Sequence, residues 1–316
     1  MILSMPLGAF GMFAFSGMAE HTQAGVDLCE RVAPHYDEDW WFLTFLGWAH
    51  TENANVAHGR RLTEQGFALR PNNAHAVHAL AHALFEQGAG READALISAW
   101  LPGYDQSGLL HGHISWHQAI VALEAGDIDR AIALYSHGVR PPVSASMPIN
   151  IISDCASFLW RVDVYGQTAP RPLWSELADY ARGVFPNGGF AFVDVHMAMI
   201  SAANGDAAGL EKRVETVSQR LAAGGFPAGP VVPAICRALP AFVEGDYGRC
   251  AALLEPVAQD VVRIGGSHAQ REVIEDTLLQ AWLRSGEIAK ARALLAARLD
   301  RRPSVRDERW RTGPDA

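Results

Sequence analysis

Glycines recur along this chain at a nearly constant interval, and this rhythm constrains the fold more than any other feature. Six of them follow one another 38 to 41 residues apart: Gly88, Gly126, Gly166, Gly205, Gly245 and Gly286. Four lie in similar phrases, each with an acidic residue directly after the glycine: EAGDIDRA, AANGDAAG, VEGDYGRC and RSGEIAKA. Glycine readily adopts the left-handed conformation that ends a helix, and an acidic residue favours the next helix start. The interval therefore predicts one helical hairpin per ~40 residues.

Breaks rich in proline and glycine separate the expected hairpins, and no alternating β-type run stands out between them. The breaks lie at 70–73, 101–108, 140–148, 185–189 and 224–233. We therefore expect an all-α fold of roughly fourteen to sixteen helices, stacked as an α-solenoid in which each hairpin buries its apolar face against its neighbours. Without a clear linker, residues 1–300 are expected to form a single repeat array, and residues 301–316 a solvated polar C-terminal tail.

The composition excludes several classes of function. The net charge is −9 and the chain has only two lysines, so no basic surface for nucleic acid is expected. The cysteines are scattered and form no CxxC pair, which indicates reduced thiols in a cytoplasmic protein: Cys29, Cys155, Cys236 and Cys250.

The first nineteen residues are uncharged, which raises the question of a membrane or export segment. This stretch contains Pro6 and three glycines, and no basic residue precedes Arg31. A secretory signal normally begins with positive charge. We therefore expect a buried first helix and no membrane contact, with an export or membrane segment as the alternative. Self-association through this apolar stretch, giving a homo-oligomer, is a further hypothesis.

Two segments with helical periodicity concentrate the histidines. AHAVHALAHALFEQG contains His78 and His82, preceded by His75, and LLHGHISWHQAIVALEAGD contains His113 and His117. Residues three or four apart share a helix face, so His75, His78 and His82 should point in one direction. The same holds for His113 and His117. The spacing is typical of helix-borne metal ligands, although the glutamate of an HExxH motif is missing. Two facing helices would form a four-ligand site for a divalent transition metal. The alternative is that these histidines only satisfy buried polar groups.

Other polar residues could complete such a pocket. Asp194 and His196 lie in the apolar run FAFVDVHMAMI, and Glu52 follows a run rich in aromatic residues. Glu52 could serve as a general base if it faces the pocket, and a solvated turn residue is the alternative. Asp154 and Arg161 share one helix face, which predicts a buried ion pair between them.

Five phrases, in order, resemble the tetratricopeptide repeat 38-like family over roughly residues 7 to 285. They are AVHALAH, HISWHQAIVALEAGDIDRAIALYS, SDCASFLWR, FVDVHMAMISAANGD and IGGSHAQRE. The resemblance implies an array of tetratricopeptide-like hairpins, in agreement with the glycine rhythm. In this resemblance, the family's paired histidines correspond to His78 and His82. Its HNxWH block corresponds to His113 and His117, and its (N/D)-A-H phrase corresponds to Asp194 and His196.

Two classes of function fit these features. The first is a binding protein for a small molecule, metal or peptide, with a His-rich inner pocket. The second is a lyase, isomerase or metal-assisted hydrolase, in which His82 or His117 is the general acid or base and Asp194 orients a histidine or binds a metal. The ligand-binding residues expected in either case are His78, His113, Trp116, His196 and Glu52, and the expected metal ligands are His78, His82, His113 and His117.

Overall fold

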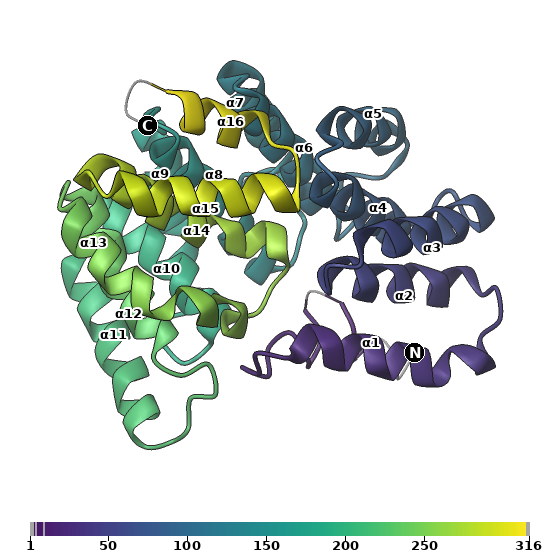
Figure 1. Cartoon of the computed structure of the whole chain (residues 1–316), viewed down its shortest axis with the longest axis horizontal. Helices are drawn as coiled ribbons and strands as arrows, with labels where there is room; N and C mark the ends of the chain where they lie inside the picture. Colours follow the sequence, from purple (N-terminus) through teal and green to yellow (C-terminus); the bar gives the residue numbers. More distant parts are fainter. Residues whose placement is uncertain (1–2, 4, 9, 314–316) are drawn as a thin grey trace.

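The computed structural model describes residues 3, 5–8 and 10–313, and these residues form sixteen α-helices and no strand (Figure 1). The even-numbered helices form a largely buried inner layer: α2 (Trp40–Glu52), α4 (Ala74–Glu86), α6 (His111–Ala125), α8 (Pro148–Val164), α10 (Ala191–Asn204), α12 (Val231–Val243) and α14 (His268–Ser285). The odd-numbered helices cover it: α3 (Val56–Leu69), α5 (Gly90–Trp100), α7 (Ile128–Gly138), α9 (Arg171–Ala181), α11 (Ala207–Ala222), α13 (Tyr247–Leu254) and α15 (Ile288–Arg301). Helix α1 (His21–Val32) precedes the layers and α16 (Val305–Thr312) follows them.

The predicted glycine stops are present at the ends of the inner helices. All six glycines of the rhythm have φ angles between 70° and 86°, a range in which other residues are strained. Gly126, Gly205 and Gly286 are the C-caps of α6, α10 and α14. After Gly126, the Asp127 side chain accepts a hydrogen bond from the Arg130 backbone N–H and so caps α7. Each repeat of the phrase thus joins one inner helix to one outer helix.

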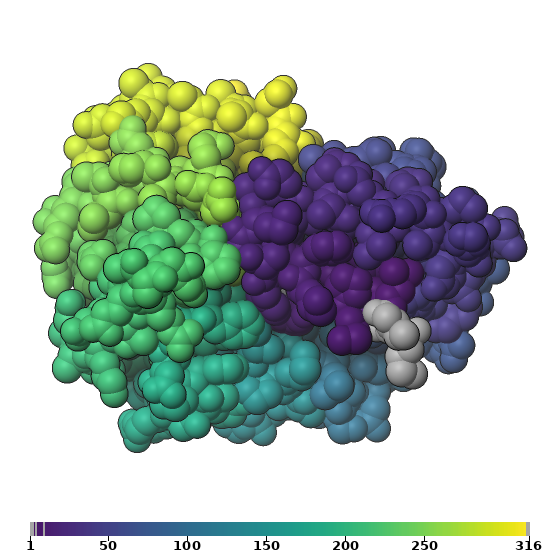
Figure 2. Space-filling model, turned by 90° about the horizontal axis from the view of Figure 1, so that it is seen from below, coloured from purple at the N-terminus to yellow at the C-terminus, as the bar shows by residue number. Residues whose placement is uncertain are grey.

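Helices next to one another in the chain pack together, but the last hairpins also return to the earlier ones. Helix α14 packs against both α4 and α8. The N-terminal segment meets the C-terminal half, where the Arg263 side chain donates to the Gly17 carbonyl at 3.0 Å (Figure 2). The all-α fold and the sequential packing are confirmed. The α-solenoid itself stays a prediction, because in an open solenoid each hairpin contacts only its neighbours, whereas here late helices also contact early ones.

The N-terminal stretch does not form the expected buried helix. Its described residues before His21 adopt turns, with Leu7 and Ala14 buried and Met12 exposed. Glycine and proline in this stretch disfavour helix, so tertiary contacts hold it instead. Among the described residues, no helix is long and apolar enough to cross a membrane.

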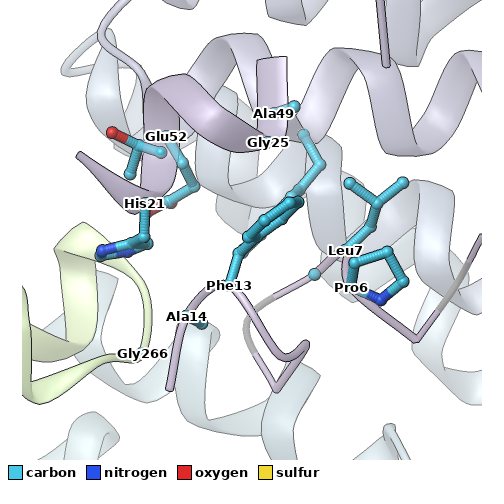
Figure 3. Close-up of a pocket in the computed structure, with 12 residues that line it drawn as sticks. Pro6, Leu7, Phe13, Ala14, His21, Gly25, Ala49, Glu52 and Gly266 are labelled. Carbon is cyan, nitrogen blue, oxygen red and sulfur yellow. The ribbon is translucent and has the colours of Figure 1, made fainter. Parts of the chain in front are cut away.

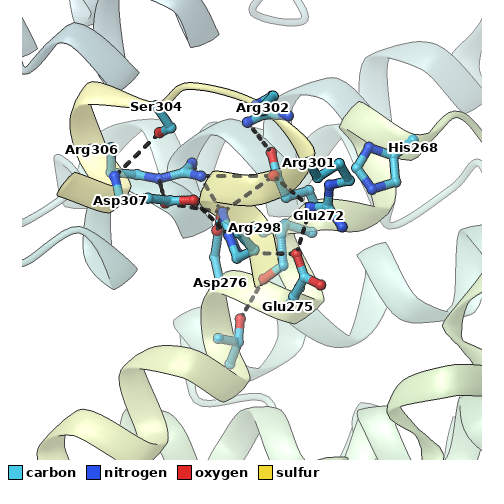
Figure 4. A network of polar contacts seen from close by, with 12 residues as sticks. His268, Glu272, Glu275, Asp276, Arg298, Arg301, Arg302, Ser304, Arg306 and Asp307 are labelled. Carbon is cyan, nitrogen blue, oxygen red and sulfur yellow. Dashed lines mark hydrogen bonds and ion pairs between the residues drawn. The ribbon is translucent and has the colours of Figure 1, made fainter. Parts of the chain in front are cut away.

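The C-terminal residues were expected to be solvated, and this is wrong for the stretch around α16. Arg302 and Asp307 are buried in a network of ion pairs with α14 and α15 (Figure 4). Arg302 Nη2 lies 2.9 Å from Glu272 Oε2, and Arg298 Nη2 lies 2.8 Å from Asp276 Oδ1. Arg298 Nε also lies 2.8 Å from Asp307 Oδ2. The charged side chains that were expected to be solvated are thus buried in ion pairs that hold the C-terminal helix against α14 and α15.

Candidate metal centre

Four histidines from α4 and α6 meet in the interior of the protein. His78 and His82 lie one turn apart on α4, and His113 and His117 lie one turn apart on α6. Each has 8% or less of its surface exposed. One ring nitrogen from each lies within 4.8 Å of those of the other three. The predicted convergence of these four residues is confirmed, and together they could hold a metal ion.

The ring nitrogens face one another at short distances. His78 Nε2 lies 3.0 Å from His82 Nε2 and 3.0 Å from His113 Nε2. The His117 Nε2 atom is buried and has no hydrogen-bond partner among the described residues. A single proton on His78 Nε2 cannot satisfy both short contacts with good geometry, because a hydrogen bond needs one nearly linear donor. At most one of the two contacts is therefore a well-formed hydrogen bond, and the other brings two nitrogens together without one.

A carboxylate behind His113 determines which of its nitrogens carries the proton. His113 Nδ1 donates to Asp154 Oδ2 of α8 at 2.7 Å, and both side chains are buried. A carboxylate oxygen that accepts this hydrogen bond places a proton on Nδ1, and in a neutral imidazole Nε2 is then the nitrogen with the lone pair. Carboxylates commonly orient metal-binding histidines in this way.

Glu52 at the end of α2 lies behind His82 in a similar position. Its Oε1 atom is 3.5 Å from His82 Nδ1, and its Oε2 atom accepts from the His268 backbone N–H at 2.7 Å. Glu52 also borders a small cavity of about 40 Å³ between the N-terminal segment, α1, α2 and Gly266 (Figure 3). The alternative of a solvated turn residue is therefore wrong for Glu52.

Two tryptophans enclose the cluster. The Trp48 ring of α2 stacks on His78 at 5.1 Å between centroids and meets His82 edge-on at 4.5 Å. Trp116 stacks on His113 at 5.4 Å and meets the His117 ring edge-on at 4.8 Å. These large rings restrict rotation of the imidazoles, so the ring nitrogens are held in place before any ion binds.

Burial keeps most of the cluster uncharged. It lowers the pKa of His78, His82 and His117 well below the usual value, and the neighbouring histidines lower it further. Burial also raises the pKa of Glu52, an effect that the nearby Arg271 partly opposes. Neutral imidazole is the form that binds metal ions, so the site favours the ligand form at neutral pH.

One side of the cluster borders an open cleft of about 600 Å³, lined by His78 and His113. His75, expected on the same helix face, lies at the exposed outer part of this cleft. An ion held by the four histidines would thus lie next to a space that a small molecule can enter.

Two predicted site residues are not part of this cluster. Asp194 of α10 forms a buried ion pair with Arg213 of α11 and accepts from the Gly189 backbone N–H. His196 Nδ1 donates to the Phe192 carbonyl within α10, and burial lowers its pKa to about 4. The role predicted for Asp194, orienting a histidine or binding metal, finds no support in these contacts.

Sequence reasoning also assigned a wrong partner and missed a site residue. Arg161 does not pair with Asp154 but lies 3.7 Å from Asp276 of α14, which leaves Asp154 free to bind His113. Trp48 was missed as a residue of the site. It lies four residues before Glu52, hence on the same helix face, and this spacing was a usable signal.

No family model matches this chain. The resemblance to the tetratricopeptide repeat 38-like family therefore stays a prediction. What stands independently of it is an all-helical protein of sixteen helices within the described residues, carrying a buried four-histidine cluster.

Proposed function

We propose that this protein binds a divalent first-row transition metal ion through His78, His82, His113 and His117. The observation that carries this proposal is the convergence of four buried ring nitrogens, with His78 Nε2 at 3.0 Å from both His82 Nε2 and His113 Nε2. Such a convergence is unfavourable when the site is empty, because nitrogens that share no proton repel one another. A cation removes this repulsion, and imidazole ligands suit zinc, copper, iron and nickel.

The charges around the cluster support a divalent ion. Four neutral histidines contribute no charge, so a buried ion of charge +2 requires compensation nearby. Asp154 and Glu52 supply two carboxylates, one behind His113 and one behind His82. A bound cation would also favour the ionised form of Glu52, whose pKa burial otherwise raises. Together the ion and the two carboxylates are neutral.

Two of the six nitrogen–nitrogen distances are compatible with a centre that has more than four ligands. With metal–nitrogen bonds of about 2.05 Å, two ligands at 90° lie about 2.9 Å apart, whereas tetrahedral ligands lie about 3.35 Å apart. The observed 3.0 Å is closer to the first value. Five- or six-coordinate ions would keep positions for water or an added ligand, and the cleft beside His78 and His113 gives access to them.

A metal-assisted enzyme is the second candidate, and the cleft is the observation that favours it. A metal ion polarises a bound oxygen or lowers the pKa of bound water, and either effect needs a substrate next to the ion. In this reaction His82 and His117 are ligands rather than the general acid or base expected from the sequence. A hydrolase or lyase using metal-bound water then fits better than a mechanism with a protein nucleophile.

Metal analysis of the full chain with two matched variants tests the proposal. The chain is stripped with a chelator, reloaded separately with zinc and cobalt, and freed of excess ion by gel filtration. His113→Asn removes the ligand nitrogen, while its amide N–H can still donate to Asp154. His58→Asn is the control, because Glu30, His50 and His58 form a second, partly exposed group able to hold a metal.

We expect one ion per chain in the wild type and in His58→Asn, and loss of that ion in His113→Asn. Circular dichroism checks that each variant is folded. The proposal is wrong if the folded wild type retains neither ion, or if His113→Asn retains as much as the wild type.

A further inference from the structure

We infer that the cleft beside the four histidines binds a small molecule with an aromatic or apolar body and one oxygen-bearing end that reaches the metal. This inference rests on the metal centre proposed above, and it adds the chemical class of the ligand. Three features of the cleft carry it: its walls, its rim and its inner end.

The walls of the cleft are mainly aromatic and aliphatic. They include Trp41, Phe45, Trp48, Tyr104 and Leu110. The volume of about 600 Å³ lies within the usual range of small-molecule sites. None of the described lining residues is Lys, Arg, Asp or Glu. A phosphate or another polyanionic body would thus lack a charged partner in the cleft, whereas an aromatic ring would pack well.

The rim of the cleft exposes apolar side chains that a bound molecule would cover. Leu109 is 59% exposed and Met147 is 43% exposed, although both are large and hydrophobic. Single exposed apolar residues are common, but these two border the same concavity. A ligand ring that covers these two side chains would bury their apolar surface, which favours binding.

The inner, buried part of the cleft lining offers a hydrogen-bond donor besides the histidines. Asn150 at the start of α8 lines the cleft together with His78 and His113. Its side chain is 2% exposed, and its Nδ2 atom has no hydrogen-bond partner among the described residues. A buried amide N–H without a partner is unfavourable, and a ligand oxygen would satisfy it. The donor and the ion would then bind the same polar end of the ligand.

The test uses the cobalt-loaded full chain and two hydroxamates, whose oxygen atoms bind metal ions. Benzohydroxamic acid carries a phenyl ring, and acetohydroxamic acid carries the same metal-binding group with only a methyl. Visible absorption of the cobalt ion reports binding at the centre. We expect benzohydroxamate to bind at least about tenfold more tightly, because the cleft buries its ring.

Variants separate the two ends of the site. Met147→Ala should weaken benzohydroxamate severalfold and leave acetohydroxamate unchanged, whereas Met12→Ala, an exposed methionine outside the cleft lining, should change neither. Asn150→Leu, which keeps the size and removes the donor, should weaken both probes about tenfold.

The outcomes distinguish this inference from the proposal beneath it. If the chain takes up no cobalt, the metal centre and the ligand class are both wrong. If cobalt binds but the two hydroxamates bind equally, and Met147→Ala changes neither affinity, the metal centre stands and the inference about the cleft is overturned.

Discussion

Replacing Asp154 with asparagine changes one proton and one charge at the proposed metal centre while leaving its shape intact. Asp154 Oδ2 accepts from His113 Nδ1 at 2.7 Å, and this bond keeps His113 Nε2 free to bind an ion. An asparagine can turn its NH₂ group toward Nδ1, which then accepts and moves the ring proton to Nε2. In that tautomer His113 cannot bind metal. The substitution also removes one of the two carboxylates that balance the ion.

The expected loss can be estimated from the burial of this pair. Changing a group that hydrogen-bonds a metal-binding histidine typically weakens metal affinity 10- to 100-fold. That range corresponds to about 1.4–2.7 kcal/mol. Asp154 is 2% exposed and His113 is 1% exposed, so solvent screens their interaction little. We therefore expect Asp154→Asn to lie near the upper end, at roughly 100-fold.

Competition with a coloured chelator measures this change as a dissociation constant. Asp163→Asn is the matched control, because Asp163 lies on the same helix but accepts from Ala169 N and Trp174 Nε1, away from the histidines. Its metal affinity should match that of the wild type. The reasoning is refuted if Asp154→Asn binds metal within twofold of the wild type, or if both variants lose affinity equally.

Three further predictions concern stability. Because the folded pKa of His196 is about 4 against an ordinary 6.5, His196 alone should cost the metal-free chain roughly 3 kcal/mol as pH falls from 6.5 to 4. The histidines of the cluster add to this loss, so urea titrations at several pH values should show the slope reduced but not abolished in His196→Gln. Arg302→Met leaves Glu272 without one of its buried cations and should lower the free energy of unfolding in urea by about 3 kcal/mol. Arg311→Met removes an exposed ion pair with Glu308 and should lower it by less than about 1 kcal/mol. Free metal at 100 times its dissociation constant should stabilise the chain by about 2.7 kcal/mol, a rise of roughly 4 °C in calorimetry that His113→Asn should abolish.

The parts of the site that the sequence predicts are those set by local geometry. The i, i+4 spacing fixes that His78 and His82 share a face, and that His113 and His117 do so. The glycine rhythm makes their helices neighbours in space, so convergence of the two pairs follows. Such features depend on residues close together in the chain, and periodicity expresses them directly.

The parts that it does not predict depend on how distant helices meet. Asp154 and Arg161 lie on one face of α8, yet their partners come from different helices. Asp154 binds His113 of α6, and Arg161 lies next to Asp276 of α14. The register between packed helices decides these partners, and a single sequence does not encode it visibly. The C-terminal arginines were assigned to solvent for the same reason, because their carboxylate partners, such as Glu272, lie on α14.

The return of the C-terminal hairpins has a consequence for the order in which the centre is completed during synthesis. Glu52 behind His82 is held by the backbone of His268, 216 residues later, and Glu86 of α4 binds the His268 ring 182 residues later. At about 5–20 residues per second, the ribosome supplies His268 on the order of 10–40 s after Glu52. During that interval the histidines of α4 and α6 can already meet, but the carboxylate of Glu52 has no anchor. Metal binding by the growing chain should therefore be weaker than by the finished protein.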